Sequence, residues 1–281
     1  MATLDTAPED VRQVVAQLRD GIAAALGSGL VGLYLTGSLT YGDFDPGSSD
    51  IDYLAVLRGP LTPAQRAALV DLHTEVGVAH PIWRERIEGS WVTLDMLPSI
   101  EPPVTPRPYV NGGAFWDPDP RYGNEWLINR YVLQECGIPL VGPPFRHLTP
   151  PLGIEPVRAA SRRDLFAEWL PQVDDPRFLP DSHHEAYATL TMCRILHRQF
   201  ADDVVSKRGA AGWTRNRVEP RWQDLIDAAL DWHHGQVLDR RAEVLAFVRF
   251  TAGVLQHPSP VWTASQAIGT GGPTPSTVPH R

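Results

Sequence analysis

Two aspartates one residue apart stand at the start of an apolar run, within the stretch TGSLTYGDFDPGSSDIDYLAVL. Asp50 and Asp52 flank Ile51, and the run that follows predicts a strand over 51–57. Because side chains two residues apart on a strand share a face, both carboxylates are expected to point the same way. Like charges at that distance repel each other, so the pair is typical of a site that binds a divalent cation.

A Gly-Ser turn precedes the aspartates and adds a second chemical element. Gly37 and Ser38 end an apolar run, and their backbone N–H groups and hydroxyl can hold phosphate oxygens. Mg²⁺ prefers one or two carboxylates together with phosphate oxygens. The turn, the aspartates and the loop that ends at Ser49 therefore predict nucleotidyl transfer, with Ser49 as a further nucleotide contact. The alternative is a solvated turn, because each of these short patterns often arises by chance.

Length and composition limit the classes of protein that fit. The chain has 281 residues, which favours two domains with separate cores. Its net charge of −8 argues against binding of duplex nucleic acid and suits a cationic partner. Apolar runs long enough to span a membrane are absent, and the N-terminal residues lack an apolar signal segment. We expect a cytoplasmic monomer, with Cys136 and Cys193 as buried, reduced thiols.

The N-terminal half alternates helical and strand patterns. Apolar residues at helical spacing end at Gly27 and again at Gly77, and a third helical pattern runs over 124–135. Residues 98–120 are rich in Pro and Gly and predict a long loop over a site. The predicted strands are 30–36, 51–57 and 91–97, and 138–141 is a short apolar run.

From about residue 156 the pattern becomes helical, which predicts a helical bundle as the second domain. Residues after about His257 are rich in Pro, Ser, Thr and Gly, a composition typical of a disordered tail. The predicted domains are 1–156 and 157–257, followed by the tail over 258–281. The helical windows are 158–170, 183–200, 207–217, 220–232 and 238–256.

The Gly37-Ser38 turn with Asp50-Ile51-Asp52 resembles the signature of the DNA polymerase β-type nucleotidyltransferase superfamily. Three further stretches are similar to the two-domain aminoglycoside adenylyltransferases that modify streptomycin and spectinomycin, and the resemblance runs from about residue 12 to 256. It implies an α+β fold, in which a polymerase β-like domain with a mixed sheet flanked by helices precedes an α-helical bundle. The stretches are RIEGSWV, EWL with CGIPLVGP, and LTMCRI with VSKRGAAGW.

The resemblance also implies roles for single residues. Asp50 and Asp52 would hold the metal ions, Ser38 would touch the phosphates, and Glu88 would be the third carboxylate, acting as metal ligand and general base. A surface carboxylate at a strand start is the plain alternative for Glu88. Asp95, further along the same predicted strand, is its rival as the base, and strand periodicity does not decide between them.

Cations and acceptor contacts are implied by the same resemblance. Arg194 and Lys207 match positions that bind the triphosphate, and His233 stands where the family has a tyrosine of its nucleotide pocket. Without the resemblance, Arg194 could instead form a structural ion pair with an acid, and Lys207 could be a solvated surface charge. Acidic and aromatic residues of the family bind the cationic drug. The candidates here are Trp116, Asp181, His184 (at an acidic position of the family) and Glu185, with Glu168, Asp174 and Asp175 as a substitute acidic cluster.

The paired histidines 183–184 and 233–234 invite a metal-site interpretation. Adjacent residues on a helix point about 100° apart, so neither pair is expected to bind one ion. Trp126 and Trp213 are expected to be packing residues.

The sequence thus predicts a Mg²⁺-dependent nucleotidyltransferase that moves AMP from ATP to a hydroxyl of a small, cationic, aminoglycoside-like acceptor. Such a reaction would give antibiotic resistance, and whether resistance is the physiological role stays open at this point. One alternative keeps the reaction but places it on a protein side chain. Another is a nucleotide-binding regulatory module that has lost catalysis. The choice of ATP over another nucleotide stays open at this point.

Overall fold

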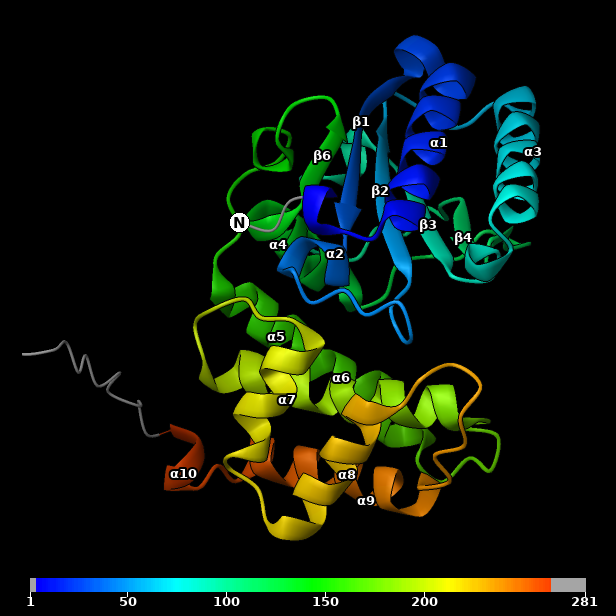
Figure 1. Cartoon of the computed structure of the whole chain (residues 1–281). Coiled ribbons are helices and arrows are strands. Elements are labelled where there is room, and N and C mark those ends of the chain that lie inside the picture. Colours follow the sequence, from blue (N-terminus) through cyan, green and yellow to red (C-terminus); the bar gives the residue numbers. More distant parts are fainter. Residues whose placement is uncertain (1–3, 264–281) are drawn as a thin grey trace, which may run out of the picture.

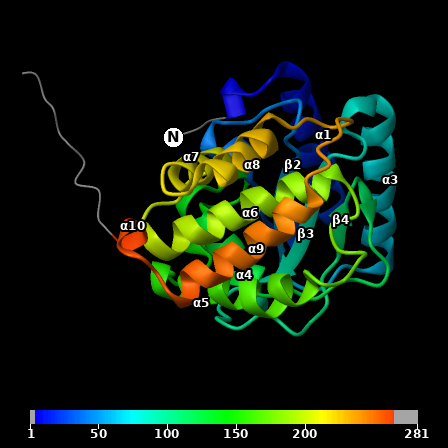
Figure 2. The ribbon, with the colours of Figure 1, turned by 90° about the horizontal axis from the view of Figure 1, so that it is seen from below.

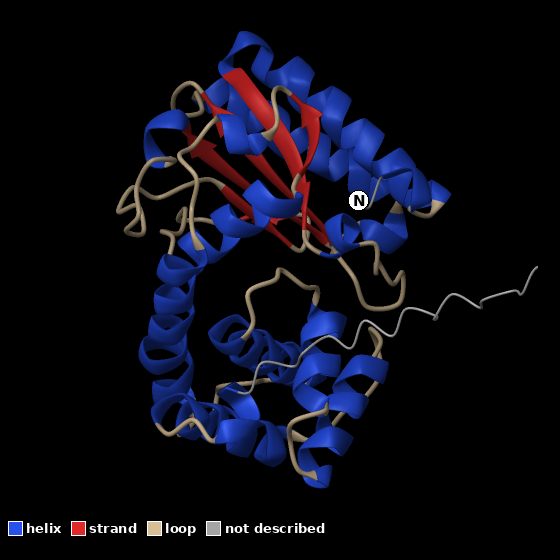
Figure 3. Ribbon diagram, turned by 90° about the vertical axis from the view of Figure 1, so that its left-hand side faces the viewer, coloured by secondary structure: helices blue, strands red, loops and turns tan. Residues whose placement is uncertain are grey.

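The computed structural model describes residues 4–263 and divides the chain into a region with a β-sheet and an all-helical region (Figures 1 and 3). The predicted α+β fold class is confirmed. In the first region the strands are β1 (Leu30–Thr36), β2 (Ile51–Leu57), β3 (Ile87–Thr93), β4 (Tyr109–Asn111), β5 (Ala114–Phe115) and β6 (Ile138–Val141), and the helices are α1 (Glu9–Leu26), α2 (Ser38–Tyr41), α3 (Pro63–Ala79) and α4 (Glu125–Cys136).

The second region consists of helices and connecting loops. Its helices are α5 (Ile154–Asp164), α6 (Ser182–Phe200), α7 (Lys207–Arg215), α8 (Pro220–Asp231), α9 (Arg241–Gln256) and α10 (Pro260–Thr263). Figure 2, viewed from below, shows α6 and α9 side by side in front of the sheet region. None of the helices within residues 4–263 has the length and apolar character that crossing a membrane requires.

The sheet has the strand order β5-β4-β3-β2-β1-β6. Strands β2 and β3 are parallel, and the other neighbouring strands are antiparallel, so the sheet is mixed as predicted. The parallel pair requires a crossover, and helix α3 supplies it. Thr62 begins α3 with a capping box, because its hydroxyl accepts the N–H of Gln65 and the Gln65 side chain accepts the N–H of Thr62.

Alternation along the strands separates two cores. Ile51, Tyr53 and Ala55 of β2 pack with α1 and α3, whereas Leu54 and Val56 lie in the core that contains residues of α4 and α5. Since side chains on a strand alternate, Asp52 belongs to the face of Leu54. On β3, Ile87 lies in the first core and Val92 in the second, so Glu88 shares the face of Asp52.

The structure corrects three expectations. Strand β3 begins at Ile87 rather than Trp91, and its end is followed by a 3-10 turn over Leu94–Met96. The Pro- and Gly-rich stretch 98–120 contains strands β4 and β5 and is not a plain loop. Cys193 is buried as expected, but Cys136 is only partly buried, and both thiols are free.

The helical region has one aromatic-rich core that extends to the end of the described chain. Trp262 of α10 is buried and lies against the rings of Phe200, Trp213 and Phe250. The predicted disordered tail is therefore wrong for 258–263, because the aromatic contacts hold α10 in place. Its remainder, 264–281, lies outside the described residues.

Candidate active site

Three carboxylates gather where β2 and β3 begin. Asp52 and Glu88 are direct partners in the parallel register of these strands, and their side chains point to the same face. Asp50 lies two residues before Asp52, and its Oδ1 is 3.4 Å from Arg86 Nε and 3.7 Å from His234 Nε2. The backbone ladder of two buried strands therefore holds two acids side by side, with a third next to them.

The environment of these acids disfavours their charged forms. Burial and the charge of Glu88 raise the pKa of Asp52 well above its usual range, although Lys207 and Arg194 oppose this shift. Burial and the charge of Asp50 raise the pKa of Glu88, which Lys207 also opposes. Two crowded, partly desolvated carboxylates that repel each other fit a bound divalent cation, because oxygen ligands of this kind are what Mg²⁺ prefers.

The Gly37-Ser38 turn lies against the acids. Gly37 has φ +66°, and a Cβ at this position would lie 1.9 Å from Asp52 Oδ2, so conformation and space both require glycine. Ser38 is the first residue of α2, directly after this turn. Ser49 has a different part: its hydroxyl accepts the N–H of Asp45 at 3.0 Å and its carbonyl accepts from Arg86, so it closes the loop before β2.

Tyr109 was missed in the sequence, and it contacts the predicted base. Its hydroxyl lies 3.4 Å from Glu88 Oε2 and accepts from Asn111 Nδ2 at 3.3 Å. Trp116 packs edge-on against the Tyr109 ring, with 5.4 Å between ring centroids, and is 48% exposed. No sequence signal marks Tyr109, because its position depends on the pairing of β4 with β3.

The position of Asp95 argues against it as the general base. Since β2 and β3 are parallel, Glu88 lies beside Asp52, while Thr93 at the far end of β3 lies beside Leu57. Asp95 follows Thr93 in the 3-10 turn and is therefore at the opposite end of the strand from the carboxylates. The prediction that it shares the strand with Glu88 is wrong, because β3 ends before it.

Helices α6 and α7 supply one cation each from the second region. Tyr187 and Arg194 are seven residues apart on α6 and therefore lie on the same face of the helix. The Tyr187 ring lies 5.9 Å from Arg194 Cζ and 5.2 Å from Lys207 Nζ, and Lys207 is the first residue of α7. Both cations lower the pKa of Asp52, so their charges act on the carboxylates. Arg194 Nη2 also donates to Thr191 Oγ1 at 3.1 Å.

The α8–α9 loop also lies against the sheet region. His233 Nε2 is 3.4 Å from Asp45 Oδ2, and the backbone N–H of His234 donates to the carbonyl of Gly47 at 3.1 Å. Gly47 has no room for a side chain, since a Cβ would lie 2.0 Å from the His233 ring. His233 thus lies at the contact between the loop before β2 and the helical region.

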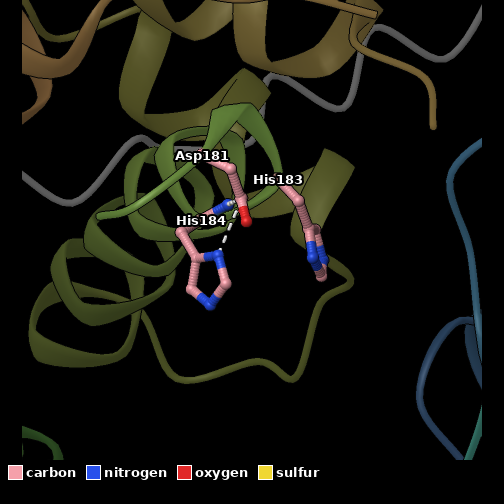
Figure 4. Close-up of side chains that lie close together, drawn as sticks. All are labelled: Asp181, His183 and His184. Carbon is pink, nitrogen blue, oxygen red and sulfur yellow. Dashed lines mark hydrogen bonds and ion pairs between the residues drawn. The ribbon is translucent and has the colours of Figure 1, made fainter. Parts of the chain in front are cut away.

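The predicted acceptor residues of α6 have unequal surroundings. Asp181 begins the helix by accepting the His184 backbone N–H at 3.0 Å, and the His184 ring lies 2.7 Å from the same oxygen; both side chains are exposed (Figure 4). Glu185 is buried and accepts the N–H of Arg240 at 2.7 Å, so it ties α6 to the start of α9. The acids Asp174 and Asp175 form surface ion pairs with arginines.

The expectation about adjacent histidines needs one correction. Ligand atoms of Asp181, His183 and His184 all lie within 4.8 Å of one another, because the His184 ring turns back toward Asp181 (Figure 4). The His183 ring stacks on Trp232 at 5.5 Å. Trp126 is buried as expected, while Trp213 is partly buried and packs against the core of the helical region.

Two comparisons with known proteins agree with this geometry. Residues 158–255 match the family model described as aminoglycoside adenylyltransferase, C-terminal domain. The resemblance to these adenylyltransferases is thus confirmed. The fold is similar to that of spectinomycin adenyltransferase AAD(9) from Enterococcus faecialis, solved with ATP and spectinomycin, with a TM-score of 0.69, 19% sequence identity, and coverage of 87% of this chain and 98% of that one. Among curated protein sequences, no match is found.

The match of the family model covers the helical region alone, and the structural similarity extends the aminoglycoside adenylyltransferase fold to the sheet region. The family model supports the prediction of a nucleotidyltransferase enzyme, and the structural similarity supports the predicted fold. The carboxylates therefore lie in a sheet region whose fold is similar to that of the spectinomycin adenyltransferase, and the cations lie in the part of the chain that the family model matches.

Proposed function

We propose that this protein transfers AMP from ATP to a hydroxyl group of an aminoglycoside-like acceptor, with Mg²⁺ as cofactor. The observation that carries the proposal is the side-by-side register of Asp52 and Glu88, with Asp50 before them and two cations opposite. Carboxylates whose pKa values are raised by burial and by the charge of a neighbouring acid would be costly in a protein without a use for them.

Each residue has a part in the reaction. Glu88 accepts the proton of the acceptor hydroxyl, the alkoxide oxygen attacks the α-phosphorus, and the bond to the bridging oxygen breaks so that pyrophosphate leaves. Arg194 and Lys207 hold the triphosphate and offset its charge. Asp50 and Asp52, with Glu88, would hold Mg²⁺, which when bound polarises the phosphoryl oxygens.

The acceptor lies on the side of Trp116 and the start of α6. Trp116 offers an exposed aromatic face next to Tyr109, and Asp181 offers a carboxylate that suits an ammonium group. Glu185 is left out of this contact set, because its buried carboxylate is used by the Arg240 N–H. The neighbour AAD(9) was solved with spectinomycin, which supports a drug of this class.

The test is an acceptor screen with ATP and Mg²⁺. We expect one or more aminoglycosides or related amino-sugars to gain the mass of one AMP unit, with one pyrophosphate released per transfer. Asp52→Asn should lose the transfer, because the variant keeps the side-chain volume and removes one negative charge. Appearance of radioactive label on protein instead of a small molecule would contradict the acceptor class, and full activity in Asp52→Asn would contradict the mechanism.

A further inference from the structure

The start of α6 carries a group of metal-ligating side chains that is separate from the three carboxylates of β2 and β3. Asp181, His183 and His184 each offer one ligand atom, and these atoms all lie within 4.8 Å of one another. Figure 4 shows the two imidazole rings on either side of the Asp181 carboxylate. All three residues are exposed, so an ion can reach them from solvent together with some of its water ligands.

The chain holds these side chains against the α8–α9 loop. Ser182, which lies between two of the three residues, accepts the N–H of Leu238 through its hydroxyl at 2.9 Å. The His183 ring is stacked on Trp232, with 5.5 Å between ring centroids and 13° between the ring planes. Within residues 4–263, the His183 ring has no hydrogen-bond partner, so its nitrogen lone pair is free for an ion. Ligands that are already ordered lose little entropy when an ion binds, which favours binding.

The combination of imidazole and carboxylate indicates the kind of ion. Imidazole nitrogen suits Zn²⁺, Ni²⁺ and Cu²⁺, whereas Mg²⁺ prefers oxygen ligands. The ligands of a tetrahedral Zn²⁺ lie about 3.3 Å apart, because its bonds to nitrogen and oxygen are about 2.0–2.1 Å long. From separations of at most 4.8 Å, small side-chain rotations bring the three ligand atoms to that spacing. Three protein ligands also leave a fourth position for water.

We propose that Asp181, His183 and His184 bind a transition-metal dication such as Zn²⁺, and that the bound ion blocks the acceptor. The blocking rests on the proposed function, which assigns the Asp181 carboxylate to an ammonium group of the acceptor. The ion takes the same carboxylate and adds positive charge that repels a cationic acceptor. His234 connects this site to the reaction site: its ring centroid is 5.5 Å from that of His183, and its Nε2 is 3.7 Å from Asp50 Oδ1.

Binding of Zn²⁺ to the whole protein, measured by calorimetry in excess Mg²⁺, tests the site. Asp181→Asn and His183→Asn should each weaken Zn²⁺ binding by at least about tenfold, since even the loss of a group that only orients a ligand costs about that much. Asparagine keeps the helix cap at position 181, so Asp181→Asn tests the ligand alone.

His147→Asn is the matched control, because His147 is an exposed histidine outside this group, and it should bind Zn²⁺ as the wild type does. Three results would each overturn the site: no Zn²⁺ binding by the wild type, unchanged affinity in Asp181→Asn or His183→Asn, or an equal loss of affinity in His147→Asn.

Steady-state kinetics tests the blocking separately. At a Zn²⁺ concentration equal to its Kd, the KM for the acceptor should rise about twofold, as for any ligand that competes at one site, while the KM for ATP stays unchanged. His183→Asn should need at least about tenfold more Zn²⁺ for the same rise. An equal rise in the KM for ATP, or no change in the Zn²⁺ that His183→Asn needs, would overturn the blocking. Zn²⁺ binding is measured without an acceptor, so a failure to find AMP transfer would leave the site itself tested.

Discussion

Two groups of carboxylates differ in how the fold holds them: one lies on β2 and β3, and the other lies at the start of α6. Asp52 and Glu88 are held by the hydrogen-bond ladder of two buried strands, and their charges stand uncompensated by a direct ion pair within the described chain. Asp181 is exposed, and its carboxylate already accepts two contacts from His184. Asp52 and Glu88 are thus held rigidly without a direct ion pair, whereas Asp181 is exposed to solvent and its carboxylate already has hydrogen-bond partners.

This difference separates chemistry from specificity. A charge held in place by β-pairing cannot relax away from its neighbours, so it is ready for a cation and for proton transfer. A charge at an exposed helix start is not held by strand pairing, and its loss costs only the helix cap, about 1 kcal/mol, so it suits a contact that varies with the acceptor. Variants of the two regions should therefore fail in different ways.

The largest effect is expected for Glu88→Gln. The amide keeps the shape but cannot take the proton, so AMP transfer should fall by at least about 100-fold, the usual contribution of a general base. Steady-state rates of pyrophosphate release measure it. Asp95→Asn is the control, because Asp95 lies at the other end of β3, and its activity should stay within about twofold of wild type. Equal losses in both variants would contradict the assignment of the base.

Tyr109→Phe sharpens the comparison within the rigid region. It removes the hydroxyl near Glu88 but keeps the ring that packs on Trp116, so we expect kcat to fall about fivefold, with the KM values for ATP and acceptor unchanged. Tyr34→Phe is the control: that hydroxyl donates to Pro143 O at 2.8 Å, just after β6, which lies on the side of β1 away from β2. It should lower the melting temperature without changing kcat. A rise in KM alone for Tyr109→Phe would refute a positioning role.

His184→Glu tests the exposed region. An added acid beside Asp181 should attract a cationic acceptor and lower its KM by about threefold, an effect that weakens as salt rises. The KM for ATP should not change. His147→Glu, at another exposed histidine, is the matched control and should leave both KM values unchanged. The same change in KM for both variants would mean that net charge alone is responsible.

Asp164, a partly buried acid at the end of α5, tests the effect of burial away from the carboxylates of β2, β3 and the start of α6. Burial, only partly opposed by a hydrogen bond from Trp169 Nε1, raises its pKa to about 6. Since the folded state then holds the proton more tightly than the unfolded chain, stability should fall as pH rises from about 4 to about 6, by roughly 2 kcal/mol. Asp164→Asn should remove that fall. Denaturant unfolding across this pH range measures it, and identical pH profiles would contradict the prediction.

The sequence allowed a good prediction where apolar runs are unbroken. Strands β1 and β2 begin and end at the predicted residues. Strand β3 was placed too late because Glu88, Gly89 and Ser90 interrupt its apolar pattern, although pairing with β2 keeps them in the strand. Strands β4 and β5 were missed, since proline and glycine dominate their surroundings and only the neighbouring strand makes them extended.

The sequence predicts which residue types form the site, but it does not predict how they are arranged in space. Asp50 and Asp52 are marked by their spacing, but the pairing of Asp52 with Glu88 depends on a parallel register that no local pattern contains. The contacts of Tyr109 with Glu88 and of His234 with Asp50 join segments far apart in the chain. Such contacts follow from topology, so the roles of Asp50, Asp52 and Glu88 remain proposals that the variants above test.

The position of Trp262 has a consequence for how the protein is made. On the ribosome, the sheet receives its last strand when Val141 emerges, so the acids can be held in register early in synthesis. The aromatic core of the helical region stays incomplete until Trp262 has been added more than a hundred residues later. Nascent chains should therefore carry the three carboxylates of the folded sheet without their cations for several seconds, until Arg194 and Lys207 fold against them.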